Sequence, residues 1–412
     1  MDNQKSPLLN IGSEIGVLKT ILLHRPGREL EQLIPKYLDE MLFEDIPYLA
    51  RMQEEHDGFA RTLRDRGAEV LYFEDLLADI LNDKDVKQSV VSEVVENLGL
   101  TDIKLRGDIS SLLDERSPEE LATTLLAGLA KADVKQSGFE KRLSYYIKDD
   151  YPFYLDPLPN LYFARDYGTV IGSRLSVNSM KARARQRESM LLQFIAKNHI
   201  RFEGAGDSLW HEYNEPESIE GGDILILNES IIAIGCSART SAEGIENLAA
   251  RLFADDERIR EVIVIQIPFA RAYMHLDTVF TMVDRDKFTI FPGITDRVHV
   301  FSLTRRKEGG IRINGREDLI KTLSKALKLP SIQLIETGGG DAVTAEREQW
   351  NDSTNTLALA PGTVVTYRRN IVSNDILREH GVEVVEIPGS ELVRGRGGPR
   401  CMSMPLKREA VD

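Results

Sequence analysis

Apolar and polar positions along the chain follow two periods that alternate from segment to segment. Segments in which every second residue is apolar, or which hold short apolar runs, predict strands, whereas apolar residues three and four apart predict helices. Short strands, an amphipathic helix and a closing strand follow one another in this order five times. The five predicted units occupy residues 16–73, 160–204, 220–268, 275–336 and 337–388.

The third unit shows the pattern most clearly. EGGDILILNESIIAIG (220–235) predicts a hairpin with a turn at Asn228 and Glu229, and EVIVIQIP (261–268) predicts the closing strand after the helix of AEGIENLAARLF. Repeats of this size are typical of supersecondary units that pack against their neighbours. We therefore predict an α/β fold, either a five-bladed, pseudo-fivefold α/β propeller or a conventional α/β sandwich.

Residues 76–150 break this pattern because they carry almost no strand signal. Within them, SPEELATTLLAGLAKA has Ser117 as a candidate N-cap, Pro118 in the first turn and Glu120 three residues after the cap, which is the sequence of a capping box. Neighbouring apolar residues recur at helical spacing. We predict a helical bundle at 76–150, inserted as a domain into a catalytic α/β domain made of residues 1–75 and 151–412.

Composition and charge narrow the classes of function. The chain has 412 residues, of which 42% are hydrophobic and 29% charged, and its net charge is −14. Such values are typical of a folded globular protein. The negative charge opposes binding to a phosphate backbone, so we expect no nucleic-acid partner. No window approaches the apolar length of a membrane span, so we expect no membrane partner.

The two cysteines, Cys236 and Cys401, are too few for a disulfide framework and are typical of a reducing compartment. We therefore expect a cytoplasmic protein in which Cys401 is a free thiol. Cys236 stands within the apolar IIAIGCS and is interpreted as a packing residue. The basic run KARARQR at 181–187 is interpreted as a solvated helix face.

Polar residues that could serve catalysis stand at the predicted starts or ends of strands. The motifs NLYFARD, EGGD and HLD supply Asn160, Asp166, Glu220, Asp223, His275 and Asp277. The two glycines of EGGD allow the backbone to bend or approach closely. His275 and Asp277 are two apart on a predicted strand, so we expect both side chains on one face. Each motif alone is weak, because EGGD is an ordinary turn composition and HxD can be a structural hydrogen bond. Their convergence on one place is what indicates a site.

A thiol joins this set near the end of the sequence. Cys401 and Arg396 lie in the glycine-rich VRGRGGPRCMSMP (393–405). A cysteine with a distant histidine and acidic residues is typical of nucleophilic catalysis. A metal site is the weaker interpretation, because the chain has no CxxC or HExxH pairing. TGGGD lacks the lysine of a phosphate loop, so we expect thiol chemistry with neither metal nor cofactor.

The charges around the thiol indicate the class of substrate. The carboxylates of Asp166, Glu220 and Asp277 would oppose formation of a thiolate, because like charges raise a pKa. They make sense if the substrate is a cation. A guanidinium is planar, always protonated and rich in N–H donors that match paired carboxylates, and its charge would favour the thiolate.

Five motifs in one order resemble the bacterial arginine deiminase family, which belongs to the guanidine-modifying pentein superfamily. The motifs are LPNLYFARD, IEGGD, MHLDT, IGCSARTS and RGRGGPRCMSMPL, and the resemblance extends over essentially the whole chain. It implies the five-bladed propeller among the two folds above, with a central site. It also implies hydrolysis of free L-arginine to L-citrulline and ammonia, without a cofactor, by a homo-oligomer.

The resemblance gives each matching position a role. Cys401 is then the nucleophile, which forms a covalent thiouronium, His275 the general acid and base, and Glu220 the residue that orients His275. Asp166 and Asp277 are expected to hold the guanidinium. Four further positions are expected to contact the amino-acid end of the substrate: Asn160, Arg185, Arg239 and Arg396. Asp223 is expected to be the supporting aspartate of the EGGD motif.

Two loops and two rival functions complete the expectations. MLFEDIPYL (41–49) and the C-terminal loop are expected to close the site, whereas Arg394 and Arg400 are interpreted as surface residues. One rival is another guanidine enzyme, such as an agmatine deiminase or an amidinotransferase. The other is a non-catalytic arginine-binding protein that has kept the pocket.

Overall fold

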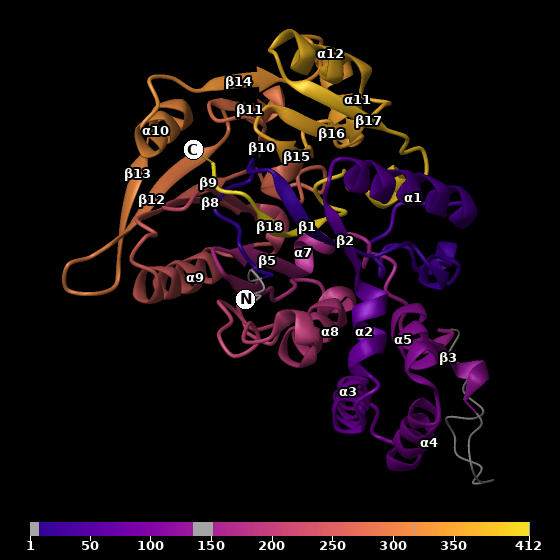
Figure 1. Cartoon of the computed structure of the whole chain (residues 1–412). Coiled ribbons are helices and arrows are strands. Elements are labelled where there is room, and N and C mark those ends of the chain that lie inside the picture. Colours follow the sequence, from indigo (N-terminus) through magenta and orange to yellow (C-terminus); the bar gives the residue numbers. More distant parts are fainter. Residues whose placement is uncertain (1–7, 135–150, 317, 412) are drawn as a thin grey trace, which may run out of the picture.

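Five sheets in the structure repeat one local order of strands (Figure 1). The computed structural model describes residues 8–134, 151–316 and 318–411. Four of these sheets contain an antiparallel pair whose second strand is also paired with a parallel strand. In the remaining sheet, the antiparallel pair β5–β6 continues in a single parallel bridge between Ser176 and His211. The predicted α/β class is thereby confirmed.

The first sheet joins strands from both ends of the described chain, and the second lies at residues 168–177. One sheet has the order β18 (Met404–Arg408), β1 (Leu18–Leu23), β2 (Glu69–Tyr72), with helix α1 (Leu49–Asp65) leading into β2. The other pairs β5 (Gly168–Ile171) with β6 (Arg174–Val177), between the short helix α7 (Ala164–Tyr167) and the long helix α8 (Arg183–Asn198).

The other three repeating sheets follow in chain order. The largest has the order β13 (Ile311–Arg316), β12 (His299–Arg305), β9 (Glu261–Gln266), β8 (Ile231–Cys236), β7 (Ile224–Asn228), with helix α9 (Ala242–Asp255). The next has β10 (Phe280–Met282), β11 (Lys287–Ile290) and β14 (Gln333–Glu336), with α10 (Leu319–Leu327). The last has β15 (Leu357–Ala360), β16 (Thr363–Tyr367) and β17 (Glu383–Ile387), with α11 (Ala342–Trp350) and α12 (Ile371–Glu379).

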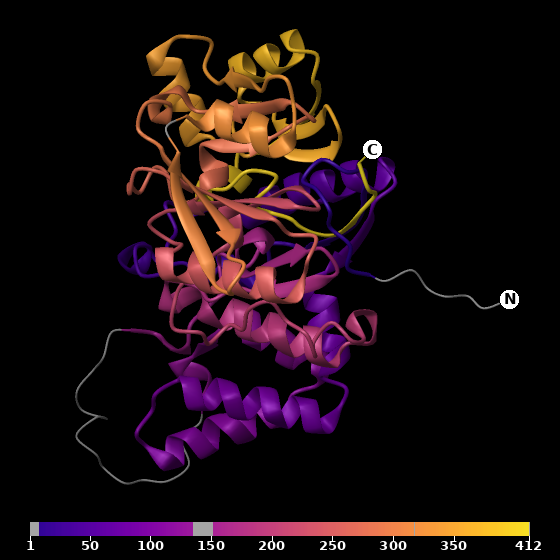
Figure 2. The ribbon, with the colours of Figure 1, turned by 90° about the vertical axis from the view of Figure 1, so that its left-hand side faces the viewer.

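Residues 73–127 are helical, in agreement with the helices expected there. They form α2 (Phe73–Ile80), α3 (Lys84–Asn97), α4 (Ile103–Asp114) and α5 (Pro118–Ala127), followed by the short pair β3 (Leu129–Ala130) and β4 (Phe153–Leu155). Helices α3 to α5 lie together at one end of the molecule in both views (Figures 1 and 2). The predicted capping box is confirmed, because the Ser117 hydroxyl accepts from the Glu120 N–H and the Glu120 carboxylate accepts from the Ser117 N–H. Residues 135–150 of the predicted insertion lie outside the described residues.

The apolar side chains gather in three clusters that determine how the layers pack. One cluster runs from the helices α2 to α5 into α8 and the strands β5 to β8, so the helical region shares its core with two sheets. A second lies between the third and fourth sheets and reaches the fifth, and a third joins the first sheet to the fifth. Within the described residues, no helix combines the length and apolar character needed to cross a membrane.

Several predicted strands are wrong, because short turns occupy their places. NLYFARD forms turns and the helix α7 before β5, and IRFEG forms a 3-10 turn (Ile200–Phe202) where a closing strand was expected. The HLD motif is also a 3-10 turn (Leu276–Thr278), with its strand beginning at Phe280. The sequence prediction missed β18, the hairpin of β12 and β13, and helix α11.

Candidate active site

The predicted catalytic residues all come from turns that precede the first strand of a sheet's antiparallel pair. Asp166 lies in α7 just before β5, and Glu220 precedes the 3-10 turn Gly221–Asp223 that leads into β7. His275 stands before the turn that leads into β10, and Cys401 lies three residues before β18. Equivalent turns of different sheets therefore place these side chains near one another.

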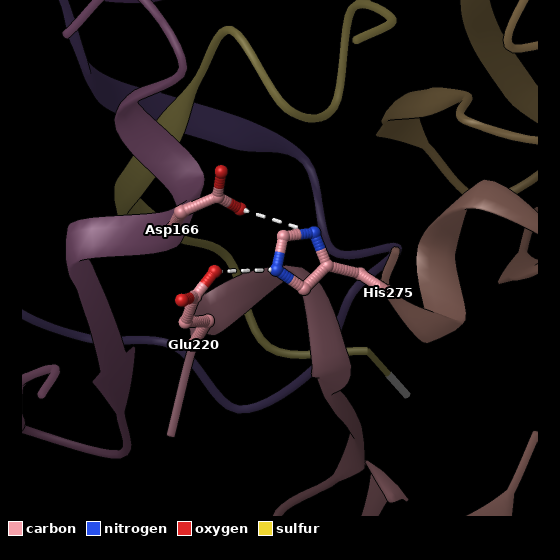
Figure 3. A group of neighbouring side chains, drawn as sticks. All are labelled: Asp166, Glu220 and His275. Carbon is pink, nitrogen blue, oxygen red and sulfur yellow. Dashed lines mark hydrogen bonds and ion pairs between the residues drawn. The ribbon is translucent and has the colours of Figure 1, made fainter. Parts of the chain in front are cut away.

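His275 is held between two buried carboxylates (Figure 3). Its Nε2 lies 2.7 Å from Glu220 Oε2, and its Nδ1 lies 3.7 Å from Asp166 Oδ1. Burial by itself lowers the pKa of His275, but the surrounding carboxylates outweigh burial and raise that pKa to about 9. The ring is therefore a cation at neutral pH that can give up a proton.

Glu220 is the carboxylate that keeps this imidazolium in place. Burial opposes its ionisation, yet the hydrogen bond to His275 and the charges of Arg239 and Arg185 lower the Glu220 pKa to about 2. Its other oxygen accepts a hydrogen bond from the Lys181 N–H at 3.0 Å. Glu220 thus stays ionised and fixed in orientation.

The paired glycines of EGGD provide the space that the histidine needs. A Cβ at Gly222 would lie 2.7 to 2.9 Å from atoms of the His275 side chain, and a Cβ at Gly221 would lie 2.0 Å from the Arg165 carbonyl oxygen. Real Cβ atoms essentially never come so close to other atoms. The expectation of a close backbone approach at this motif is confirmed.

Asp223 supports the HLD segment from behind. Its two oxygens accept hydrogen bonds from the Leu276 N–H and the Ser237 hydroxyl, each at 2.7 Å. Burial raises the Asp223 pKa to about 7. Asp223 does not line the cavity described below. Its hydrogen bond from the Leu276 N–H holds the backbone between His275 and Asp277.

Cys401 is buried beside two side chains from other sheets. Its Sγ lies 3.7 and 3.9 Å from the two oxygens of Asp277, and 3.0 Å from Asn355 Nδ2. Burial raises the pKa of the Cys401 thiol well above its usual range, and the charges of Asp277, Asp166 and Asp352 act in the same direction. The free thiol is therefore protonated at neutral pH, and a cation next to it is needed to favour the thiolate.

The interpretation of Arg400 as a surface residue is wrong. Arg400 is 1% exposed, and its Nη1 donates to Asp277 Oδ2 at 2.7 Å. Its Nε and Nη2 each donate to Glu14 at 3.2 Å, and Nη2 also donates to the Ile224 carbonyl at 2.7 Å. A buried carboxylate from the opposite end of the chain could not be read from the local sequence. Arg394, in contrast, is paired near the surface with Asp45 and Glu391.

A narrow cavity brings most of the predicted residues together. Its volume is about 20 Å³, little more than one water molecule requires, so arginine can enter only if the surrounding loops move. Seven predicted residues line it: Asn160, Asp166, Arg185, Arg239, His275, Arg396 and Cys401. Glu220, Asp223 and Asp277 lie behind these walls. The other lining residues are Leu42 and Gly395, which belong to the two segments expected to close the site, and Phe163, Met274 and Thr278, which sequence reasoning missed.

The expectation that His275 and Asp277 share one face of a strand is wrong, because His275 directly precedes the 3-10 turn Leu276–Thr278 and Asp277 lies within it. His275 lines the cavity, whereas Asp277 is completely buried behind it and contacts Cys401 and Arg400. Desolvation raises the Asp277 pKa, and the cations Arg400 and His275 oppose this rise. Arg400 therefore favours the ionised form of Asp277.

The three predicted arginines differ in how far they are already paired. Arg185 donates to Asp166 Oδ2 at 2.6 Å and to Glu188 at 2.8 Å. Arg396 has a left-handed backbone (φ 65°) and stacks on Trp350, with 3.5 Å from its Cζ to the ring centroid. Its Nε and Nη1 have no hydrogen-bond partner. Arg239 is half-buried and donates to Met274 Sδ at 3.7 Å.

The two expected lid segments contact each other beside the cavity. Leu42 of the first segment lines the cavity, and the Asn160 side chain donates to the Met41 carbonyl at 2.6 Å. The Tyr48 N–H donates to Glu391 at 2.8 Å, and Asp45 pairs with Arg394 of the C-terminal loop. The two segments therefore form one wall, with exposed contacts that can break when the site opens.

Among the described residues, one cluster has the geometry to hold a metal ion: Asp166, Glu220 and His275. The charges within it already have partners, however. Asp166 is paired with Arg185, and Glu220 with the imidazolium of His275. A metal ion would have to displace a proton and an arginine from the cluster, whereas a planar cation needs only Asp166 and Asp277 as additional acceptors.

Comparisons of the whole chain with known proteins indicate one family. A family model described as arginine deiminase matches residues 39–408. The arginine deiminase of Bacillus cereus is 49% identical over 408 residues, which are 98% of this chain and 99% of that protein.

Two solved structures share the fold at low sequence identity. An amidinotransferase from Microseira wollei, of the saxitoxin biosynthetic pathway, is 14% identical with a TM-score of 0.59 over 98% of both chains. A dimethylarginine dimethylaminohydrolase variant in an adduct with S-methyl-L-thiocitrulline is 15% identical with a TM-score of 0.53, over 94% of this chain and 99% of that one.

Proposed function

The chain belongs to the arginine deiminase family, which hydrolyses L-arginine to L-citrulline and ammonia, and we propose that Cys401 is the nucleophile of this reaction. One observation carries the proposal: Cys401 and His275 line the same cavity, with buried carboxylates around both. A guanidinium can donate to the oxygens of Asp166 and Asp277 that Arg185 and Arg400 leave free, whereas a neutral substrate would leave the repulsion between these carboxylates and a Cys401 thiolate in place.

Asp166 and Asp277 hold the guanidinium on opposite sides of the sulfur in this proposal. Asp166 Oδ1 is buried without a hydrogen-bond partner, and Asp277 uses only one oxygen for Arg400. Both carboxylates raise the pKa of Cys401, so a cation bound between them removes the repulsion that keeps the thiol protonated. The substrate thus favours the thiolate that attacks it.

The first half of the reaction forms the covalent intermediate. When the guanidinium binds, the Cys401 thiol loses its proton to solvent. The thiolate bonds to the guanidinium carbon, and the displaced electron pair moves onto a nitrogen, giving a tetrahedral adduct. His275 donates its proton to the departing nitrogen, the C–N bond breaks with its electron pair on nitrogen, and ammonia leaves. A thiouronium cation on Cys401 remains, and His275 is neutral.

The second half consumes water and restores the enzyme. Neutral His275 takes a proton from a water molecule whose oxygen bonds to the thiouronium carbon. The resulting adduct collapses to the carbonyl of citrulline as the C–S bond breaks and its electron pair returns to sulfur. The hydroxyl proton of the adduct leaves to solvent, where the released ammonia takes up a proton as ammonium. His275 is again protonated, held in orientation by Glu220 at 2.7 Å.

The amino-acid end of the substrate lies against cations in this proposal. Arg396 offers Nε and Nη1 without partners, and Arg239 is half-buried at the cavity wall, so both can bind a carboxylate. Arg185 reaches it only by giving up a contact with Asp166 or Glu188. The Asn160 side chain joins these groups from the same wall. These contacts favour arginine over agmatine, which has no carboxylate.

We extend the proposal to the organisation of the molecule. The repeated strand order supports a five-bladed, pseudo-fivefold propeller of residues 1–75 and 151–412 around the site, with residues 76–150 as an inserted helical domain. In this proposal the enzyme works as a cytoplasmic homo-oligomer and binds no nucleic acid, which agrees with its net charge of −14.

The test is a colorimetric citrulline assay with arginine and agmatine as substrates. The parent protein is expected to release citrulline and ammonia from arginine, and to act far more slowly on agmatine. Cys401→Ala is expected to bind arginine in a calorimeter without turnover. Comparable rates on agmatine, or transfer of the amidine to an added amine, would favour the other guanidine enzymes. Turnover by Cys401→Ala would exclude the proposed nucleophile.

A further inference from the structure

Asn355 makes two hydrogen bonds to the cysteine proposed as nucleophile. Its Nδ2 donates to Cys401 Sγ at 3.0 Å, and its Oδ1 accepts from the Cys401 N–H at 2.9 Å. The backbone N–H can only donate, so the oxygen must face it and the amide N–H must face the sulfur. The side chain is completely buried, so no water competes for either contact.

The position of Asn355 in the fold matches that of the other site residues. It lies two residues before β15, the first strand of the antiparallel pair in the fifth sheet. The equivalent turns before β5, β7, β10 and β18 carry Asp166, Glu220, His275 and Cys401. Asn355 is thus the residue that the fifth sheet contributes to the centre.

The turn that carries Asn355 is held by buried hydrogen bonds. The Asn355 N–H donates to the Asp352 carbonyl at 3.0 Å. The neighbouring Thr354 donates its hydroxyl to the Thr278 carbonyl at 2.5 Å, next to the HLD motif. A Cβ at Gly398 would lie within 2.7 to 2.8 Å of Asn355 atoms, so the loop before Cys401 packs directly on the asparagine. The geometry around the sulfur is therefore fixed before substrate arrives.

We propose that Asn355 is a further catalytic residue, which stabilises the Cys401 thiolate through its amide N–H and aims the sulfur at the substrate. The proposal rests on Cys401 being the nucleophile. The sulfur also contacts Asp277, and the charges of Asp277, Asp166 and Asp352 oppose the thiolate. Among the described residues, Asn355 supplies the side-chain N–H that donates to the sulfur. A hydrogen bond to an ionised acceptor is stronger than one to a neutral acceptor, so this contact favours the thiolate over the thiol.

The contact acts twice in the reaction. In the first half it stabilises the Cys401 thiolate, whose formation the bound guanidinium favours. In the second half the C–S bond breaks and the electron pair returns to sulfur, so the same N–H stabilises the leaving thiolate. Loss of Asn355 is therefore expected to lower kcat in addition to slowing the reaction of the free thiol.

The test measures how fast iodoacetamide alkylates Cys401 at pH 8, with Cys236→Ser as the parent so that only one thiol reacts. Loss of a hydrogen bond to a charged group is expected to raise the thiol pKa by about one to two pH units. The thiolate fraction then falls about tenfold per unit, while the nucleophilicity of the remaining thiolate rises by about threefold. Asn355→Ala is therefore expected to react about three- to tenfold more slowly.

Two further variants separate this effect from a loss of structure. Asn355→Leu has a similar shape without the donor, and is expected to react as slowly as Asn355→Ala. Asn370→Ala removes an equally buried asparagine, which donates to the Asn351 carbonyl and does not touch Cys401, and is expected to react at the parent rate. Arginine affinity, measured in a Cys401→Ala background, is expected to change less than twofold in Asn355→Ala.

The inference is overturned if Asn355→Ala or Asn355→Leu, folded by circular dichroism, is alkylated at the parent rate. It is also overturned if both lose only arginine affinity and keep kcat. If Asn355→Ala does not fold, Asn355→Leu decides alone, and failure of both to fold would show a structural role and equally refute the inference. A parent protein that makes no citrulline would refute the proposed function, which the alkylation series distinguishes from an error about Asn355.

Discussion

Arg400 donates a hydrogen bond to Asp277 at 2.7 Å, so the residue that precedes Cys401 already occupies one oxygen of the carboxylate that we propose binds the guanidinium. Glu14 holds Arg400 from the other side, and the cations Arg400 and Arg165 lower the Glu14 pKa to about 2 against the opposing effect of burial. In our proposal this buried arrangement leaves the second oxygen of Asp277 for the substrate, and the charge of Arg400 opposes the rise that burial causes in the Asp277 pKa.

Replacement of Arg400 is expected to weaken substrate binding. In Arg400→Gln the Asp277 pKa rises further, so the protonated carboxyl no longer attracts a guanidinium. We expect kcat/KM for arginine to fall roughly ten- to hundredfold, mainly through KM, because breaking one partner of a buried pair leaves the other uncompensated. Raising the pH should restore part of the activity. Arg400→Lys, which keeps the charge, serves as the control, and an unchanged KM in Arg400→Gln would contradict the assignment.

The pair of His275 and Glu220 predicts the alkaline limit of activity. A His275 pKa of about 9 means that the general acid keeps its proton below that pH and loses it above. In the free enzyme, kcat/KM is expected to fall as pH rises through about 9. Glu220→Gln removes one of the charges that raise this pKa, so the limit is expected to move to lower pH. A pH–rate profile of both proteins decides, and an unmoved limit would show that His275 is not the titrating acid.

The same pair contributes to stability in a defined pH window. The His275 pKa of about 9 in the folded protein lies above the ordinary value of 6.5, so the contribution of the pair to the free energy of unfolding is complete below pH 6.5. That contribution is lost as pH rises through 9. Urea unfolding of the parent and of Glu220→Gln at several pH values measures the difference, which should shrink at alkaline pH.

Gly222→Ala is expected to abolish most activity with little loss of secondary structure. The new Cβ would lie 2.7 Å from the nearest His275 ring atom, so the imidazole must leave its position beside Glu220. Displacement of a general acid of this kind costs on the order of a hundredfold or more in kcat. Gly107→Ala is the matched control, because nothing lies within 4 Å of its added Cβ in helix α4. Equal kcat in both variants would refute the tight approach.

Arg396→Gln tests which end of the substrate meets the C-terminal loop. If Arg396 binds the carboxylate, kcat/KM for arginine is expected to fall about tenfold or more, whereas the slow reaction with agmatine should change less than twofold. Arg271→Gln, an exposed arginine paired with Asp39 and Glu44, is the control for charge loss on the same side. Equal losses on both substrates would show that Arg396 only supports the loop.

Local sequence signals were sufficient where short-range physics decides the structure. The capping box of Ser117 and Glu120 and the close packing at Gly222 needed only neighbouring residues or a motif, and both were predicted. The HLD motif was assigned to a strand because alternation cannot distinguish a short strand from a 3-10 turn that precedes one. A turn of this kind places His275 and Asp277 at different depths.

The residues that were missed depend on contacts across the chain. Arg400 is buried because Glu14, 386 positions away, and Asp277 neutralise it. Asn355 lies in an ordinary polar segment, DSTNT, and becomes informative only when the fifth sheet places it against Cys401. Its position could have been anticipated by asking which turn the fifth repeat offers to the common centre.

The central claim is that Cys401 forms a covalent bond to the guanidinium carbon of arginine. Mass spectrometry of the Cys401 peptide, after acid quenching during turnover of L-arginine, tests it most directly. The account predicts that this peptide gains the mass of arginine less one ammonia, and that the gain disappears once substrate is exhausted. Citrulline formation with an unmodified Cys401 peptide throughout, or with the adduct on Cys236, would contradict it.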